Sequence, residues 1–165
     1  MITSSWYLER SVGVVLAALL LRNILSISFV PSDSMFPSLE RGDAVVVEHV
    51  SNRVFPNHCP RGDMVFFRPP PALEAYIRDK AGVKLGSRDN FVKRVVACPA
   101  DEVEVFPDGG VAVNGDSVNT GNFGDGELPY ARWVLDGDEV FVLGDNRSHS
   151  VDSRFWGPLP ERYIE

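Results

Sequence analysis

The sequence predicts a mainly β protein, in which a single N-terminal transmembrane helix is followed by one domain of antiparallel strands. Residues 11–30 form a continuous apolar stretch with a single charge, Arg22. After it, short runs rich in β-branched residues alternate with clusters of Gly, Pro, Asn and Asp. The chain has 165 residues, 44% of them hydrophobic, which is enough for one ordinary domain with a core.

The apolar stretch at residues 11–30 has the length that spans a bilayer as a helix, roughly 20 residues. Its Leu, Ile, Val and Phe residues outweigh the cost of Arg22, roughly 2.5 to 3.5 kcal/mol at a helix centre. A buried core helix would show a polar face, and a cleavable signal would carry a shorter apolar core and a cleavage site of small residues. We therefore expect residues 1–10 to be an N-terminal flank and residues 11–30 to be a retained anchor in the lipid bilayer. Arg10 places the N-terminus on the cytoplasmic or stromal side and the rest of the chain on the opposite, trans side.

Residues 31–165 are predicted to form the β-rich domain. Its expected strands are "DAVVVEHV", "DMVFF", "FVKRVV", "EVEVF", "VAVNG", "SVN" and "EVFVL". "PDGG" and "NGD" supply the turns of hairpins between the later strands. Residues 72–80, "ALEAYIRDK", suggest a short helix inside a long polar connection, which we interpret as an insertion or flexible loop at about residues 69–90.

Charge and cysteine content exclude several classes of partner. The net charge is −7, and the sequence has no Lys/Arg cluster long enough to follow a phosphate backbone, so a nucleic acid partner is not expected. Cys59 and Cys98 lie far apart, outside any CxxC or Cys/His group, so no metal site and no cofactor are predicted. One disulfide and two buried free thiols are both compatible with this spacing.

Ser34 lies in "PSDSMFPSLERGD", in a turn bounded by Pro31 and Pro37 directly after the predicted membrane exit, and Ser32 stands two residues before it. A serine in such a turn is usually a turn former or a helix cap. A catalytic role would require a base, and the next candidate block supplies one.

Lys93 lies in "FVKRVVACPAD", where strand alternation puts it on the same face as Phe91 and Val95. A lysine at the rim of a sheet would reach water, whereas burial would lower its pKa by disfavouring the ammonium form. Lowering the pKa from about 10.4 to near neutral takes roughly three units, or about 4 kcal/mol. A neutral Lys93 would then accept the proton of Ser34.

The third polar block is "GDNRSHSVDSRFWGPLP", residues 144–160, which follows the "EVFVL" strand. Its aromatic end suggests a loop packed on the sheet, and the alternative is a solvated turn with an ion pair. A triad of Ser34 and His149 with Asp145 or Asp152 ranks below a serine and lysine pair, because Ser34 has no GxSxG elbow.

Together these blocks resemble the type I signal peptidases, membrane-anchored serine proteases that use a Ser/Lys dyad. The resemblance covers nearly the whole chain and rests on "PSDSMFPSL", "RGDMVFF", "FVKRVVACPAD" and "GDNRSHSVDSRFWGPLP", in the family's order after one anchor. It implies the β-fold of signal peptidases and repressor proteases, with residues 31–165 as the catalytic domain. It also implies removal of signal peptides from translocated precursor proteins, by cleavage after small residues in an Ala-x-Ala pattern.

Carried over position by position, the resemblance makes Ser34 the nucleophile and Lys93 the general base. Ser32 matches the residue whose hydroxyl joins the backbone N–H of Ser34 in the oxyanion hole, and Ser150 matches a serine that orients the lysine through a hydrogen bond. The expected supporting residues are a loop-holding carboxylate and an ion pair: Asp145, Asp152 and Arg154.

Two positions depart from the family pattern. Ala100 stands where a glycine is common, which would change the type of turn. Asp33 puts a carboxylate beside the oxyanion hole, where it would oppose the developing negative charge unless it points to water. Asp33 is the main support for an alternative, an inactive membrane-tethered β-domain that binds precursor peptides without cutting them.

The long loop after "FFRPPP" and the "WGPLPERYI" ending are most similar to plastid thylakoidal processing peptidases and their cyanobacterial relatives. A single-pass protein with its catalytic domain in the thylakoid lumen or periplasm is therefore expected, with the plastid and bacterial membranes both open. A mitochondrial inner-membrane peptidase shares the dyad, but its chains usually lack so long a loop before the lysine strand.

Overall fold

A computed structural model describes residues 11–12, 24–55, 58–86, 89–118 and 128–165. The chain divides into two compact units. One unit consists of residues 1–29 and 44–58, and the other of residues 30–43 and 59–165.

Most of the predicted anchor lies outside the described residues, as does the whole of the predicted N-terminal flank, residues 1–10. Among the residues that are described, no helix is both long enough and apolar enough to cross a membrane. The last part of the stretch, Leu25–Phe29, is strand β1, so the prediction that a helix continues to residue 30 is wrong there. The reason lies in its own pattern, since apolar residues alternate with Ser26 and Ser28, as on a strand.

The first unit is built on a two-stranded antiparallel sheet. Strand β1 pairs with β2 (Ala44–Glu48), and Ile27 lies opposite Val46. The short helix α2 (Ser51–Val54) follows β2.

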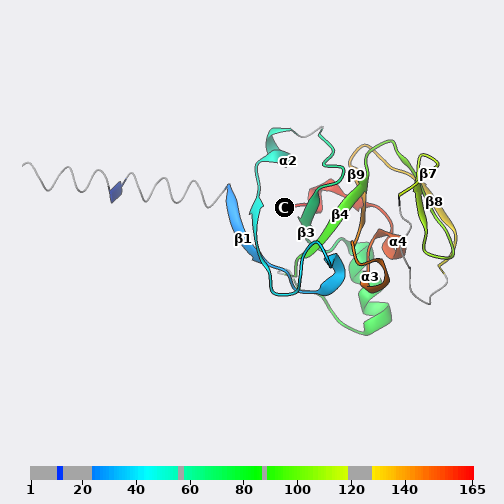
Figure 1. Cartoon of the computed structure of the whole chain (residues 1–165), viewed down its shortest axis with the longest axis horizontal. Helices are drawn as coiled ribbons and strands as arrows, with labels where there is room; N and C mark the ends of the chain where they lie inside the picture. Colours follow the sequence, from blue (N-terminus) through cyan, green and yellow to red (C-terminus); the bar gives the residue numbers. More distant parts are fainter. Residues whose placement is uncertain (1–10, 13–23, 56–57, 87–88, 119–127) are drawn as a thin grey trace, which may run out of the picture. The chain divides into compact units, whose positions relative to one another are not determined.

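The second unit contains two four-stranded antiparallel sheets, which confirms the mainly β fold class. The first sheet has the order β10-β9-β4-β3 and contains the predicted lysine strand (Figure 1). Its strands are β3 (Met64–Phe67), β4 (Phe91–Ala97), β9 (Glu139–Leu143) and β10 (Leu159–Pro160).

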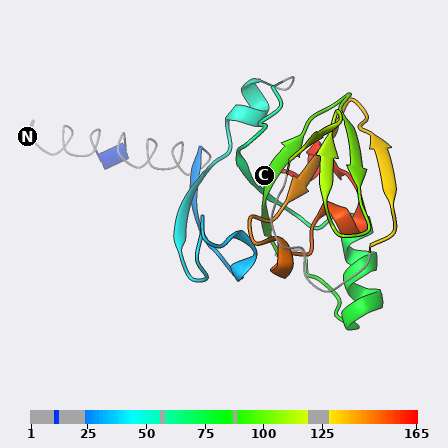
Figure 2. The same cartoon turned by 45° about the vertical axis from the view of Figure 1, so that its right-hand side comes forward.

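The second sheet has the order β7-β6-β5-β8 (Figure 2). Its strands are β5 (Glu102–Val105), β6 (Val111–Val113), β7 (Asp116–Ser117) and β8 (Ala131–Val134). The expected hairpins are present, because the turns at Gly109 and at Asn114–Gly115 have the positive φ angles that such tight turns use. A cluster of buried apolar side chains joins the two sheets, with Val96, Val105 and Phe141 among its members.

Helix α3 (Pro71–Ala81) occupies much of the predicted insertion at about residues 69–90, so the helix expected at 72–80 is present. Pro71 stands in its first turn, and Gly82, with a φ of 66°, ends it. Leu73 is fully buried, and the Tyr76 ring lies 5.6 Å from that of Phe155 in α4 (Ser153–Trp156). The insertion is thus attached to the sheet next to the third polar block (Figure 2).

Three 3-10 turns complete the described structure: η1 (Asp33–Met35), η2 (Arg147–His149) and η3 (Glu161–Tyr163). Cys59 and Cys98 form a disulfide, with their Cα atoms 5.7 Å apart. Of the two possibilities that the sequence left open, the structure contains the disulfide.

Candidate active site

The Ser34 turn is fixed from both sides. Ser34 and Met35 in η1 are buried, and Met35 is completely inaccessible. Asn146, in the loop after β9, donates its backbone N–H to the Ser34 carbonyl (3.0 Å) and its side-chain amide to the Asp33 carbonyl (3.1 Å). The position of the Ser34 hydroxyl is therefore set by its own turn and by the loop that follows β9.

Lys93 extends from the middle of β4, where it pairs with Val65 of β3, and only 3% of its surface is exposed. Its Nζ donates to Ser34 Oγ (2.7 Å) and to the Val92 carbonyl (2.9 Å). Burial lowers the pKa of Lys93 to about 8, against the opposing charges of Asp152 and Asp145. About a tenth of this amine is therefore neutral at pH 7 and about a half at pH 8, in contact with a serine hydroxyl.

Ser32 lies on the exposed side of the same turn and donates its hydroxyl to Ser34 Oγ (3.2 Å). The structure thus brings together the three side chains that the resemblance assigns to the reaction centre. Asp33, between the two serines, is exposed. Its carboxylate is hydrated, which reduces its effect on charge at Ser34.

Ser150 is buried, but its hydroxyl has no hydrogen-bond partner among the described residues. The hydrogen bond to Lys93 that the resemblance implies is therefore not made in this structure. Instead Ser150 packs against Gly144, where a Cβ would come within 2.1 Å of Ser150 Oγ and 2.6 Å of the Ser34 carbonyl oxygen. The Val92 carbonyl, which sequence reasoning missed, holds Lys93.

Asp152 and Arg154 form the expected ion pair, and both are buried. Arg154 Nε donates to Asp152 Oδ1 (2.8 Å) and its Nη2 to Asp152 Oδ2 (3.0 Å). Asp152 Oδ2 also accepts the backbone N–H of Gly144 (3.0 Å), and Arg154 Nη2 donates to the Arg147 carbonyl (2.7 Å). This pair fixes both ends of the loop that holds the Ser34 turn.

Asp145 is paired with Arg94, the residue after Lys93. Arg94 donates Nε and Nη2 to the two carboxylate oxygens, at 2.8 and 2.6 Å. Burial opposes the charged carboxylate, but the hydrogen bonds from Arg94 and Ser38 outweigh it, so the pKa of Asp145 lies below its usual value. Sequence reasoning missed Arg94, although strand alternation had already placed it on the face opposite Lys93.

His149 takes no part in a triad. It is exposed, and its Nδ1 lies 2.8 Å from Ser148 Oγ. The carboxylates of Asp145 and Asp152 are held by arginines. Among the described residues, Lys93 is the basic side chain that contacts Ser34.

Comparison with known proteins assigns the family. The family described as signal peptidase, peptidase S26, matches residues 4–165. The chain belongs to this family. The predicted resemblance is thereby confirmed, and the family is one of serine protease hydrolases.

Cyanobacterial and chloroplast proteins are among the relatives of this chain. The chain is 38% identical to a probable signal peptidase I-1 of Synechocystis sp., over 99% of this chain and 82% of that protein. It is 34% identical to a signal peptidase I of Leptolyngbya laminosa, over 92% of this chain and 70% of that protein. Against the thylakoidal processing peptidase 1 of Arabidopsis thaliana it is 41% identical, over 79% of this chain but 37% of that protein.

Proposed function

We propose that this chain removes N-terminal signal peptides from translocated precursor proteins, cutting after a small residue with Ser34 as nucleophile and Lys93 as general base. The observation that carries the proposal is the 2.7 Å contact between Lys93 Nζ and Ser34 Oγ at a buried site. The family assignment and the cyanobacterial and thylakoidal relatives support the same substrate class.

The reaction begins with the neutral form of Lys93. The amine accepts the Ser34 proton as the oxygen attacks the scissile carbonyl carbon. The resulting ammonium returns that proton to the leaving amine, which departs as the N-terminus of the mature protein. A water molecule, deprotonated by the same amine, then attacks the ester carbonyl. The bond to Ser34 Oγ breaks, the ammonium returns the proton to that oxygen, and the signal peptide leaves with a new carboxylate.

The oxyanion that forms during each attack requires hydrogen-bond donors. The backbone N–H of Ser34 and the hydroxyl of Ser32 are proposed for this role, since Ser32 Oγ lies 3.2 Å from the nucleophilic oxygen on the open side of the turn. Loss of one such donor typically lowers the rate by about 10²- to 10³-fold.

We further propose that the protein acts on the trans side of a bilayer, in the thylakoid lumen or the periplasm, with the apolar residues before β1 contributing the single-pass anchor. Directly after these residues, Ile27 of β1 and its partner Val46 of β2 are 71% and 68% exposed, and Phe29 is 70% exposed. Exposed apolar side chains on one small sheet fit contact with lipid better than contact with water. The disulfide fits an oxidising compartment.

The proposal is tested with the detergent-solubilised protein and a precursor carrying alanine at the −1 position. Wild type is expected to release mature protein, and Ser34→Ala and Lys93→Ala are expected to release none. Ser148→Ala is the matched control, because Ser148 is an exposed serine of the nearby η2 turn that contacts His149. Equal turnover by the wild type and both dyad variants would refute the assignment.

The alternative of an inactive peptide-binding domain predicts a different result in the same assay. The precursor would be retained by wild type and by all three variants, and no mature product would appear. Because Asp33 is exposed, its carboxylate opposes negative charge at Ser34 less than a buried carboxylate would, which favours the proposed activity.

A further inference from the structure

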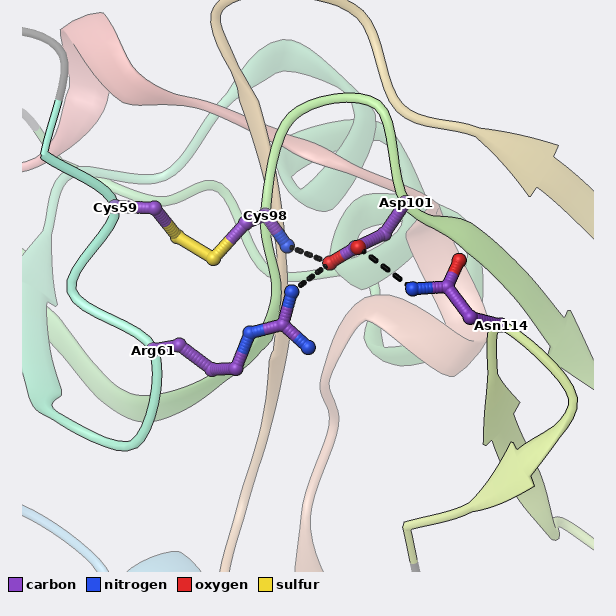
Figure 3. Close-up of a disulfide and its surroundings, with 5 residues drawn as sticks. All are labelled: Cys59, Arg61, Cys98, Asp101 and Asn114. Atoms are coloured by element: carbon purple, nitrogen blue, oxygen red, sulfur yellow. Dashed lines mark hydrogen bonds and ion pairs between the residues drawn. A yellow bond between two sulfur atoms is a disulfide. The ribbon is translucent and has the colours of Figure 1, made fainter.

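Asp101 is a buried carboxylate that the proposed mechanism does not use. It lies in the turn between β4 and β5, and its Oδ2 accepts the backbone N–H of Cys98 (2.7 Å) and the Arg61 guanidinium. Its Oδ1 accepts the side-chain amide of Asn114 (2.8 Å). Figure 3 shows the carboxylate between these three partners, so one side chain joins the loop before β3, the end of β4 and the turn after β6.

The disulfide connects two of the same segments. Cys59 lies two residues before Arg61, and Cys98 is the residue whose N–H Asp101 binds (Figure 3). The Arg61 side chain is 49% exposed, so this ion pair is expected to add little to global stability. We expect loss of this ion pair to change the position of the Arg61–Asp63 loop rather than the free energy of unfolding.

That loop is bonded to β4 immediately after the catalytic lysine. Gly62 donates its N–H to the Val95 carbonyl (2.8 Å), and Val95 donates its N–H to the Asp63 carbonyl (3.0 Å). The Gly62 carbonyl accepts Arg94 Nη1 (2.6 Å). The Gly62 carbonyl is therefore one of the groups that hold the Arg94 guanidinium in place.

Arg94 in turn holds the loop that fixes the nucleophile. Its Nε and Nη2 bind Asp145, and the next residue, Asn146, donates its backbone N–H to the Ser34 carbonyl (3.0 Å). Hydrogen bonds and peptide bonds therefore together form one path from Asp101 to the Ser34 turn, which passes through Arg61, Gly62, Arg94, Asp145 and Asn146.

We propose that Asp101 is a positioning residue for the Ser34–Lys93 dyad, because its bond to Arg61 sets the Gly62 carbonyl that orients Arg94. The inference rests on the proposed function and adds a residue to it. A shift of about 1 Å in a reacting group typically costs about 100-fold in rate. A loosened loop would also admit water to Lys93, and its pKa would rise toward the value in water.

The test uses the full chain in the precursor assay, with Asp101→Asn as the first variant. This substitution keeps the shape and removes the charge that binds Arg61. The kcat is expected to fall about 10- to 100-fold, with KM within about twofold of wild type. The lower pKa of the pH profile of kcat/KM is expected to move upward. Arg61→Gln removes the same pair from its exposed end, without touching Cys98 or Asn114, and remains informative if Asp101→Asn does not fold.

Glu102→Gln is the matched control, because Glu102 is the next residue and pairs with Arg132 on β8, away from the Arg61–Asp63 loop. It is expected to retain the wild-type kcat and pH profile. A solely structural role for Asp101 would lower the melting temperature while kcat per folded molecule and the pH profile stayed at wild-type values. That result in both Asp101→Asn and Arg61→Gln would overturn the inference.

A Ser34→Ala arm separates the two proposals. If Ser34→Ala retains turnover, the proposed function fails, and the positioning role fails with it. If Ser34→Ala is inactive while Asp101→Asn and Arg61→Gln match wild type, the positioning role alone is refuted.

Discussion

Replacement of the catalytic base should make the protein inactive and, at neutral pH, more stable. Lys93→Met keeps a long, unbranched side chain at a site that is almost completely buried and removes its ionisable amine. The wild-type protein holds this amine where burial lowers its pKa from 10.5 to about 8, so folding opposes the charged form. At pH 7 the amine is charged in the unfolded state and about nine-tenths charged in the folded state, so the folded state carries nearly the full cost of burying that charge.

The magnitude follows from proton linkage. Because the folded pKa lies below the unfolded pKa, the unfolded chain binds more protons between about pH 8 and 10.5, and wild-type stability rises with pH in that window. From pH 7 to pH 10 the rise is about 2.5 kcal/mol for this group. Methionine has no such dependence, so the stability advantage of Lys93→Met should shrink by the same amount over that interval.

The assay is urea unfolding of both proteins at several pH values from 7 to 10. Other titrating groups are common to the two proteins and cancel in the difference. The lost hydrogen bonds to Ser34 and to the Val92 carbonyl lower the absolute gain. The pH dependence of the difference is therefore the decisive quantity, and a difference that stays constant would refute the buried-amine argument.

Three further predictions concern the rate, a turn and the disulfide. Since the pKa of Lys93 is about 8, the neutral fraction and hence kcat/KM should rise about tenfold from pH 7 to pH 9, and a flat profile would contradict the assigned base. Ala100 adopts a φ of 68°, which is strained for a residue with a Cβ. Ala100→Gly should therefore stabilise the fold by roughly 1 kcal/mol and raise the melting temperature by about 2 to 4 °C, and a lower melting temperature would count against strain at this turn. The Cys59–Cys98 bridge joins residues that are 39 apart in the sequence. Its reduction should lower the free energy of unfolding, measured in urea, by about 4 kcal/mol. The Cys59→Ser/Cys98→Ser double variant should show the same loss without reductant.

The strands and hairpins were predictable because their signals are local. The alternation in "EVEVF", the short run of apolar residues in "EVFVL" and the turns near Gly109 and Gly115 act over a few residues, and the structure follows them. The prediction of a helix at the end of the apolar stretch was wrong because it depended on overall length and not on a local pattern. At Leu25–Phe29 a continuous apolar run satisfied the length of a membrane helix, and this obscured the period-two pattern of a strand.

The site depended on tertiary contacts that no local pattern contains. Ser34 and Lys93 are 59 residues apart in sequence, so their contact could be expected from the family resemblance but not from spacing. Strand alternation put Lys93 on an apolar face, and its burial follows that pattern. The Arg94–Asp145 pair and the unbonded Ser150 hydroxyl depend on how separate loops pack, which composition does not reveal.

The cysteine bridge also makes the protein convenient for spectroscopy. Both cysteines of the sequence are joined to each other, so neither reacts with a maleimide or a nitroxide reagent while the bridge is intact. A cysteine introduced at an exposed position of α3, such as Lys80, would be the single labelling site of the chain. A spin label there would report the depth of α3 relative to a lipid bilayer without any change to the native residues around Ser34.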